Sequence, residues 1–277
     1  MLFQLLALRN RFTYIRQMRR VLTFFLCFYG FIALSAQHGA VATVDPLATD
    51  AAVRVMKKGG NAIDAAVAAG LTLGVVNGYN SGIGGGCFIV ARLSNGRVIT
   101  INGRETAPAK AHRDMYLRNG KPDTGLSQIG PLASGVPGAL AAYAQLAKAH
   151  GKLPLRVHLE TAATVAEKGF AIPAAYAGRI RATAKGLAKF PASGALFLKA
   201  DGSPKVAGNL LKQPDLARTY RAIAKEGTGW FYGGPFARKT ELWMKDNGGI
   251  LAARDFTNYK TTSPPPVRTT YRGHTIL

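Results

Sequence analysis

A run of three glycines and an Arg-Glu pair are the residues of this sequence best suited to binding a ligand. The glycines, Gly84–Gly86, lie in the segment NSGIGGGCFIV, and Arg104-Glu105 lies in the segment INGRETAP. A guanidinium binds a carboxylate through two parallel hydrogen bonds, and glycine N–H groups can line a concave anion site. The same residues also fit an ordinary buried turn in which Arg104 pairs with a local acid such as Glu105. The spacing alone favours the ordinary turn over the anion site.

A predicted β-hairpin brings these two segments together. Strand-like runs at 87–93 and 97–102 flank Asn95-Gly96, and Asn-Gly between two such runs is a strong hairpin signal. A two-residue loop pairs residues whose numbers sum to 191, which sets Cys87 opposite Arg104 and Gly86 beside Glu105. A longer loop slides this pairing by a residue or two. The hairpin at 87–102 therefore predicts that the glycine run lies next to Arg104.

The remaining sequence is predicted to be mostly helical. Asp45-Pro46 and Asn61 are typical helix N-terminal signals, so helices are expected over 47–58 and 62–76, with Gly59-Gly60 ending the first. Small apolar residues cover nearly every face of the second helix, which we expect to be buried on all sides. Residues 192–213 are expected to form a loop, and further helices are predicted over 138–150, 155–168, 174–190, 214–226 and 235–246. The fold class is α+β.

Other catalytic patterns are not found in the sequence. The segment Gly82-Ile83-Gly84 lacks the third glycine of a dinucleotide-binding fingerprint because position 87 is a cysteine. No Lys-Ser or Lys-Thr follows the glycines, as a phosphate-binding loop requires. The five histidines lack the spacing of metal ligands. We therefore predict no metal site, no dinucleotide-binding fingerprint and no phosphate-binding loop, and we expect Cys87 to pack as a small hydrophobic residue.

The charge balance is strongly basic, with 36 Lys and Arg against 14 Asp and Glu and a net charge of +22. Five arginines lie before residue 37, where there are no acidic residues, and the other basic residues are spread singly or in pairs. No block of five like charges and no basic strip interleaved with aromatic residues is present, so nucleic acid is not a predicted partner. The charge favours a solvated surface that attracts anionic solutes or membranes.

The N-terminal segment has the layout of a secretory signal peptide. Residues 21–36, VLTFFLCFYGFIALSA, form an uncharged apolar run that follows Met18-Arg19-Arg20 and ends in small residues. We predict a signal peptide over residues 1–36, with Met18 as an alternative start and an uncleaved membrane anchor as the alternative interpretation. The protein is therefore expected to be periplasmic or secreted.

Several motifs in series resemble the gamma-glutamyltranspeptidase family from about residue 39 to the last residue. They are AVATVDPLATDAAVRVMKKGGNAIDAAVAAGLTLGVVN, SGIGGGCFIV, INGRETAPAKAHRDMYL, SGVPGALAAYAQLAKAHGKLP and the closing GPFARKTELWMKDNGGILAARDFTNYK. The resemblance implies an exported precursor that cuts itself into a large and a small subunit. It also implies the four-layer α-β-β-α sandwich of the N-terminal-nucleophile (Ntn) hydrolases, without a cofactor. The new N-terminal threonine of the small subunit attacks γ-glutamyl compounds such as glutathione, and the acyl group passes to water or to an acceptor amino acid or peptide.

The resemblance also assigns roles to the residues singled out above. Arg104 falls on the arginine that holds the substrate α-carboxylate, Gly84, Gly85 and Gly86 fall on the glycine run behind that pocket, and Glu105 is its orienting neighbour. The self-cleavage site and the catalytic threonine belong to a part of the family that follows Leu277. We therefore expect residues 37–277 to be the N-terminal portion of a large subunit, incomplete at its C-terminus and inactive without the missing small-subunit part.

One departure from the family leaves the substrate open. A His-Pro-like sequence often precedes the glycine run in the family, whereas this chain has Asn77-Gly78-Tyr79-Asn80. This difference calls into question whether glutathione is the preferred substrate. The alternatives are a related Ntn acylase that deacylates β-lactam side chains or other amides, and a non-catalytic periplasmic module that binds a carboxylate.

Overall fold

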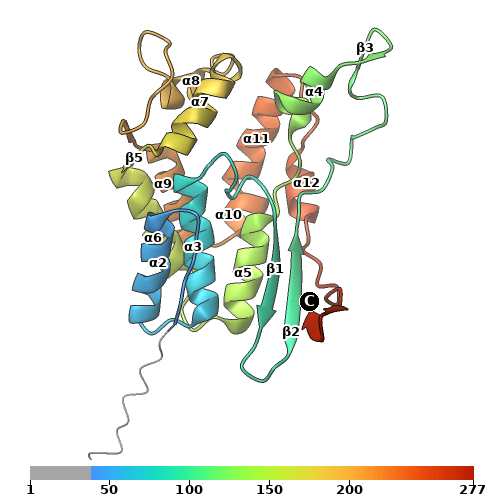
Figure 1. Ribbon diagram of the computed structural model, residues 1–277. Coiled ribbons are helices and arrows are strands. Elements are labelled where there is room, and N and C mark those ends of the chain that lie inside the picture. The colour runs from blue at the N-terminus through green and yellow to red at the C-terminus, as the bar shows by residue number, and fades with distance from the viewer. Residues whose placement is uncertain (1–38) are drawn as a thin grey trace, which may run out of the picture. The chain divides into compact units, whose positions relative to one another are not determined.

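Helix α3 (Ala62–Val76) is the central element of the computed structural model, which describes residues 39–277 (Figure 1). Ten of its fifteen residues are buried, because neighbours pack on nearly every face of this helix of small apolar residues. Asn61 caps it: the Asn61 side chain accepts the N–H of Asp64, and the Asp64 carboxylate accepts the N–H of Asn61. The predicted bounds and the predicted burial are confirmed.

Three more helices lie on one side of the core and bury apolar residues near α3. Helices α2 (Pro46–Lys57) and α6 (Leu155–Lys168) pack directly against α3, and α9 (Pro214–Glu226) packs against α6. Asp45 caps α2 by accepting the N–H of Leu47 at 2.9 Å, as its position before Pro46 predicts. Leu71 and Leu159 are fully buried in this core.

A buried carboxylate, Asp64, ties α3 to the loop that enters α6. It accepts N–H groups from Asn61, Lys152 and Leu153 at 2.8 to 3.2 Å and contacts Nε2 of His158 at 3.1 Å. Burial raises the pKa of Asp64, but the backbone N–H donors outweigh this effect, so its pKa lies below the ordinary value. Burial lowers the pKa of His158 despite the adjacent carboxylate, so the imidazole is neutral. The pair serves the fold and lies in the core.

The predicted hairpin is formed by β1 (Cys87–Arg92) and β2 (Val98–Gly103), and helix α5 (Ala139–His150) lies between it and α3 (Figure 1). Its register differs from the expected one by one residue, because Cys87 pairs with Gly103 and not with Arg104. The loop is one residue longer than the predicted two, since Leu93 bonds to Arg97 and Gly96 adopts a φ of 83°. Such a turn, with a left-handed glycine as its last residue, is a standard three-residue hairpin loop.

The two faces of the hairpin have different surroundings. On one face Ile101 is buried, and Gly103 lies so close to α5 that a Cβ on it would meet the Cβ of Ala142 at 2.6 Å. On the other face Phe88 is 71% exposed and Val90 is 59% exposed. Covered and exposed side chains alternate along the strands, as in a sheet that is covered on one face only. At its end β2 also forms an isolated antiparallel bridge, between Asn102 and Thr262.

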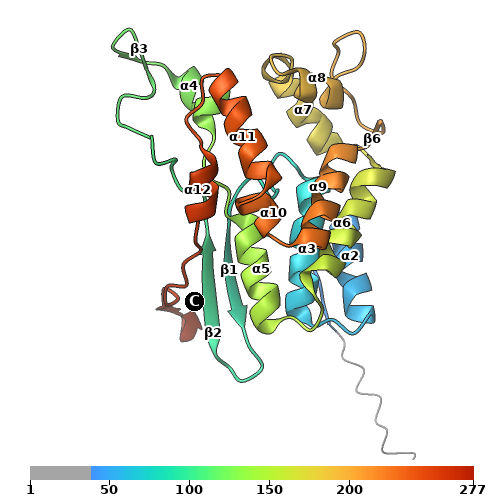
Figure 2. The same ribbon diagram turned by 180° about the vertical axis from the view of Figure 1, so that it is seen from behind.

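The other elements are short or peripheral. The predicted helix over 174–190 ends at residue 187, and the expected loop over 192–213 contains a helix, α8 (Pro191–Phe197), and a strand. Pro191 explains this difference, because it forces Phe190 into an extended conformation and is itself well suited to the first turn of a new helix. The helices not yet named are α4 (Thr124–Gln128), η1 (Pro131–Ala133), α7 (Ala174–Leu187), α10 (Gly229–Tyr232), α11 (Pro235–Asp246) and α12 (Ala253–Asn258), the last three of which form a group visible in Figure 2.

Three further two-stranded antiparallel sheets complete the described chain: β3 (Leu117–Arg118) with β4 (Lys121–Pro122), β5 (Phe170–Ala171) with β6 (Leu210–Leu211), and β7 (Thr269–Tyr271) with β8 (His274–Ile276). The turn between β7 and β8 is at Arg272-Gly273, and both residues have positive φ. The apolar run at 21–36 lies outside the described residues. Within 39–277, no helix combines the length and the apolar character that crossing a bilayer requires.

Candidate functional site

The glycine run lies in the loop between α3 and β1, where it is held against the start of α5. The carbonyl oxygen of Gly85 accepts the N–H groups of Gly138 and Ala139, both at 3.0 Å, and Gly85 N–H closes a turn onto the Gly82 carbonyl. The amides of Gly84 and Gly86 donate to no acceptor within residues 39–277. The loop is therefore fixed in place while two of its N–H donors stay available to a ligand.

Arg104 lies beside this loop, as the hairpin predicted. Its Nη1 is 3.4 Å from the carbonyl oxygen of Gly86, and its guanidinium is 5.9 Å from the centre of the Phe88 ring. Gly86 leaves no space for a side chain here, because a Cβ on it would be 2.7 Å from the Cα of Arg104. The side chain of Arg104 is 51% exposed, so its guanidinium remains accessible to a solute.

Glu105 forms an ion pair with the same guanidinium. Its Oε2 is 3.0 Å from Nη2 of Arg104, and its carboxylate lies over Gly85 and Gly86. Both interpretations of the sequence therefore describe this place: Arg104 approaches the glycine run and also pairs with Glu105. An anionic ligand would approach a guanidinium that is already positioned, but it would compete with a carboxylate for part of its hydrogen bonding.

The backbone of Arg104 is held by residues that the sequence did not point to. Its N–H donates to Oδ1 of Asn102 at 2.9 Å, and its carbonyl oxygen accepts the hydroxyl of Tyr259 at 2.8 Å. Tyr259 stacks on Tyr232 with ring centres 5.9 Å apart. Its hydroxyl occupies the space that a side chain at Gly138 would need, which is why a glycine precedes α5.

Arg104, Glu105 and the glycine loop border a cavity of about 650 Å³. Its walls come from the end of α3, the glycine loop, the start of α7, α8 and the start of α9, so segments far apart in the sequence meet here. All five residues predicted for the site, Gly84, Gly85, Gly86, Arg104 and Glu105, line it. The lining residues that were not predicted include Tyr79, Tyr176, Phe197, Gln213 and Leu216. The predicted residues therefore share one cavity, and their roles in binding stay predictions.

Cys87 follows the glycine run directly and is half-buried. Burial raises the pKa of its thiol, so the group stays protonated and poorly nucleophilic at neutral pH. This position agrees with the expected packing role.

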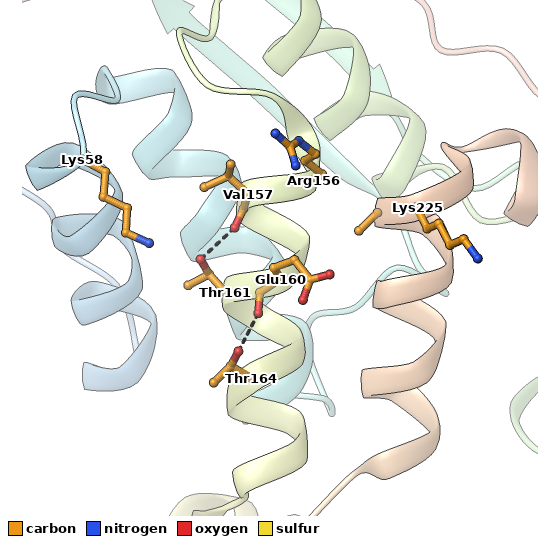
Figure 3. A pocket seen from close by; sticks show the side chains of 8 residues that line it. Lys58, Arg156, Val157, Glu160, Thr161, Thr164 and Lys225 are labelled. Atoms are coloured by element: carbon orange, nitrogen blue, oxygen red, sulfur yellow. Dashed lines mark hydrogen bonds between the residues drawn. The ribbon is translucent and has the colours of Figure 1, made fainter.

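A separate hollow between α2, α6 and α9, away from Arg104, is less suited to a specific ligand (Figure 3). Its cations are Lys58, Arg156 and Lys225, and its one carboxylate is Glu160. The hydroxyls of Thr161 and Thr164 both donate to carbonyl oxygens of their own helix, as the dashed lines in Figure 3 mark. The polar groups left for a ligand are flexible surface side chains, so the cavity at Arg104 is the better candidate.

Comparisons with known proteins point to one family. The family model for gamma-glutamyltranspeptidase matches residues 48–277. The glutathione hydrolase proenzyme of Escherichia coli (strain K12) is 37% identical over 248 residues, which are 89% of this chain and 43% of that protein. The acylase ACY 1 proenzyme of Pseudomonas sp. (strain SE83) is 37% identical over 88% of this chain and 45% of its own length. This chain thus spans less than half of these relatives.

A solved structure shows the same arrangement. The gamma-glutamyltranspeptidase of Helicobacter pylori superposes with a TM-score of 0.83 at 37% sequence identity, over 86% of this chain and 68% of that one. The predicted class is therefore confirmed: the fold is α+β and is part of the Ntn-hydrolase sandwich. This chain belongs to the gamma-glutamyltranspeptidase family.

Proposed function

We propose that the complete protein transfers or hydrolyses γ-glutamyl groups, and that Arg104 binds the α-carboxylate of the γ-glutamyl head group. The observation that carries the proposal is the position of a half-exposed guanidinium 3.4 Å from the carbonyl of Gly86, at the edge of a cavity of about 650 Å³. A carboxylate there can replace Glu105 as the partner of the guanidinium and accept the free amides of the glycine loop.

In this proposal the residues of this chain bind and orient the substrate. The head group is fixed by its α-carboxylate, which directs the γ-carbonyl away from Arg104 toward the attacking residue. That residue is the N-terminal threonine that the family resemblance implies, and the small subunit would supply it. The threonine hydroxyl would attack the γ-carbonyl to form a γ-glutamyl ester, and the amine of the cleaved amide would leave with a proton. Water or an acceptor amine would then take the acyl group and restore the hydroxyl, without a cofactor.

Calorimetry with γ-glutamyl compounds tests the binding step. We expect the Arg104→Ala protein to bind glutamate or glutathione at least about tenfold more weakly, since a charge-assisted pair is worth about 1.5 kcal/mol or more. Arg113→Ala is a matched control, because Arg113 also pairs with the acid that follows it but is 92% exposed and does not line the cavity. Equal losses in the two variants would contradict the proposal.

A chromogenic γ-glutamyl anilide tests the reaction. We expect turnover when residues 1–277 are combined with the remaining part of the enzyme, and none from residues 1–277 alone. Turnover by residues 1–277 alone would contradict the assignment of the nucleophile to another part. Binding of simple carboxylates without turnover in the complete protein would instead favour the non-catalytic carboxylate-binding module.

An acylase is the second candidate, because a relative named acylase ACY 1 proenzyme matches this chain at the same 37% identity as the E. coli glutathione hydrolase. The two activities differ in what they need from Arg104. Loss of activity in Arg104→Ala on γ-glutamyl substrates, with acyl amides that lack an α-amino acid head group unaffected, would separate them.

We also propose that the protein is exported through the segment at 1–36 and acts in the periplasm or outside the cell. The support is its basic start, apolar run and small-residue end. Cell fractionation, followed by N-terminal sequencing of the exported chain, tests this: a cytosolic protein with an intact Met1 would contradict it, and an intact segment in the membrane would favour the anchor.

A further inference from the structure

A second cavity, of about 390 Å³, adjoins the cavity at Arg104. The two share five lining residues, namely Gly78, Tyr79, Asn80, Tyr176 and Phe197. The shared wall contains the turn that follows α3 and one side chain each from α7 and α8. The second cavity is therefore a separately lined space that adjoins the cavity at Arg104.

Aromatic rings form much of this wall. Tyr79 and Tyr176 have ring centres 5.0 Å apart, and Tyr176 and Phe197 have ring centres 6.2 Å apart. Gly78 allows the turn to close on this cluster, because a Cβ there would be 2.9 Å from the hydroxyl oxygen of Tyr176. Burial raises the pKa of Tyr176 to about 12, so its hydroxyl keeps its proton at neutral pH. These rings suit a planar or apolar group.

A cation completes the second cavity. Arg179 lines it, and its guanidinium is 5.9 Å from the centre of the Tyr79 ring. No Asp or Glu lines this cavity, and Arg179 forms no ion pair with an acidic side chain of residues 39–277. Arg104 differs in this respect, because Glu105 is its partner. An anionic group of a ligand would therefore meet no competing carboxylate at Arg179.

We propose that this second cavity is a subsite for the group attached to the γ-glutamyl carbonyl, and that it selects an aromatic amino acid with a free carboxylate. The ring would pack on Tyr79, Tyr176 and Phe197, and the carboxylate would pair with Arg179. The proposal rests on the proposed function, because it takes the head group at Arg104 as the anchor of the ligand. It adds the class of substrate: γ-glutamyl derivatives of aromatic amino acids.

Calorimetry with three ligands tests the subsite on the purified full chain. γ-Glutamylphenylalanine has both the ring and the distal carboxylate, γ-glutamylalanine lacks the ring, and γ-glutamylbenzylamide lacks the distal carboxylate. We expect γ-glutamylphenylalanine to bind about tenfold more tightly than either of the others. Arg179→Ala should weaken its binding about tenfold and leave the benzylamide unchanged, since only the former has the carboxylate.

Matched variants exclude a general effect on folding. Arg181→Ala is the control for charge, because Arg181 is exposed on the same helix and lines neither cavity. Tyr79→Leu keeps an apolar side chain but removes the ring, and it should abolish the preference for phenylalanine over alanine. Circular dichroism of each variant should match the unmodified protein.

The outcomes separate the subsite from the proposed function. Equal binding of γ-glutamylphenylalanine and γ-glutamylalanine, both lost in Arg104→Ala, would overturn the subsite and support the proposed function. Binding of N-acetylphenylalanine that depends on Arg179, without binding of any γ-glutamyl ligand through Arg104, would support a subsite for aromatic carboxylates and overturn the proposed function. Millimolar ligands that bind at neither place would overturn both.

Discussion

Replacing Gly86 with alanine tests why glycine is needed at this position. Either the loop packs too closely against Arg104 to leave space for a side chain, or only the backbone flexibility of glycine matters. A Cβ on Gly86 would be 2.7 Å from the Cα of Arg104, from Oε2 of Glu105 and from the carbonyl oxygen of Gly103. Each contact is about 0.7 Å shorter than the 3.4 Å at which ordinary contact begins. Two of the three atoms belong to the backbone, so they cannot move away by a change of rotamer.

The expected effect follows from this crowding. Overpacking of a tight site commonly lowers the free energy of unfolding by about 1–3 kcal/mol, and we expect Gly86→Ala to fall in this range. The displaced Arg104 should also bind γ-glutamyl ligands at least about tenfold more weakly. Urea unfolding measures the first quantity and calorimetry measures the second.

Gly84→Ala is the matched control within the same run of residues. No atom lies within 4 Å of a Cβ at Gly84, and its φ is not positive. Alanine there restricts the unfolded chain without a clash, so we expect a gain of about 0.5 kcal/mol in the free energy of unfolding. If the two variants shift stability equally and in the same direction, the packing of the loop against Arg104 described above is wrong.

Three further predictions concern the residues that hold the site and the core. Asp64→Ala should lower the free energy of unfolding by about 3–5 kcal/mol in urea titrations, because it leaves three N–H donors and His158 without a partner. Asp50 is exposed, so Asp50→Ala should change the free energy of unfolding by less than about 0.5 kcal/mol. Because the pKa of His158 is lowered on folding, its neutral form stabilises the protein above pH 6.5; thermal melts should show this stability being lost as the pH falls below that value, and His158→Gln should remove this acid-dependent loss. Tyr259→Phe removes the hydroxyl that holds the carbonyl of Arg104, and it should weaken γ-glutamyl binding several-fold with little loss of secondary structure by circular dichroism, an effect that a purely structural tyrosine would not have.

Local signals in the sequence predicted the helices well. Asp45 and Asn61 cap α2 and α3 through their own side chains, so the residue types alone indicate where these helices begin. The bounds of α5, α6, α9 and α11 agree with the predictions to within one residue. The hairpin was predicted, but its register was wrong by one residue. Asn95-Gly96 signals a turn and does not fix its length, because a left-handed glycine can end either a two-residue or a three-residue loop.

The candidate site could be predicted only in part, for a physical reason. Arg104 and the glycine run are joined by a hairpin, and a hairpin can be read from neighbouring residues. The hydrogen bond from the Tyr259 hydroxyl to the carbonyl oxygen of Arg104 joins residues 155 positions apart, so no local sequence pattern predicts it. The aromatic wall likewise brings together Tyr79, Tyr176 and Phe197 from three separate elements. Such contacts are set by tertiary packing.

The unpaired edge and the exposed face of β1 have a practical consequence for work with this chain. The side of β1 that does not pair with β2 has no neighbouring strand within residues 39–277, and the strand shows Phe88 and Val90 to solvent. A strand with free backbone groups and apolar side chains is a template for pairing with another molecule. Preparations of the isolated polypeptide should therefore scatter more light as they are concentrated, and a polar replacement of Val90, which lines neither cavity of the site, offers a route to more soluble material.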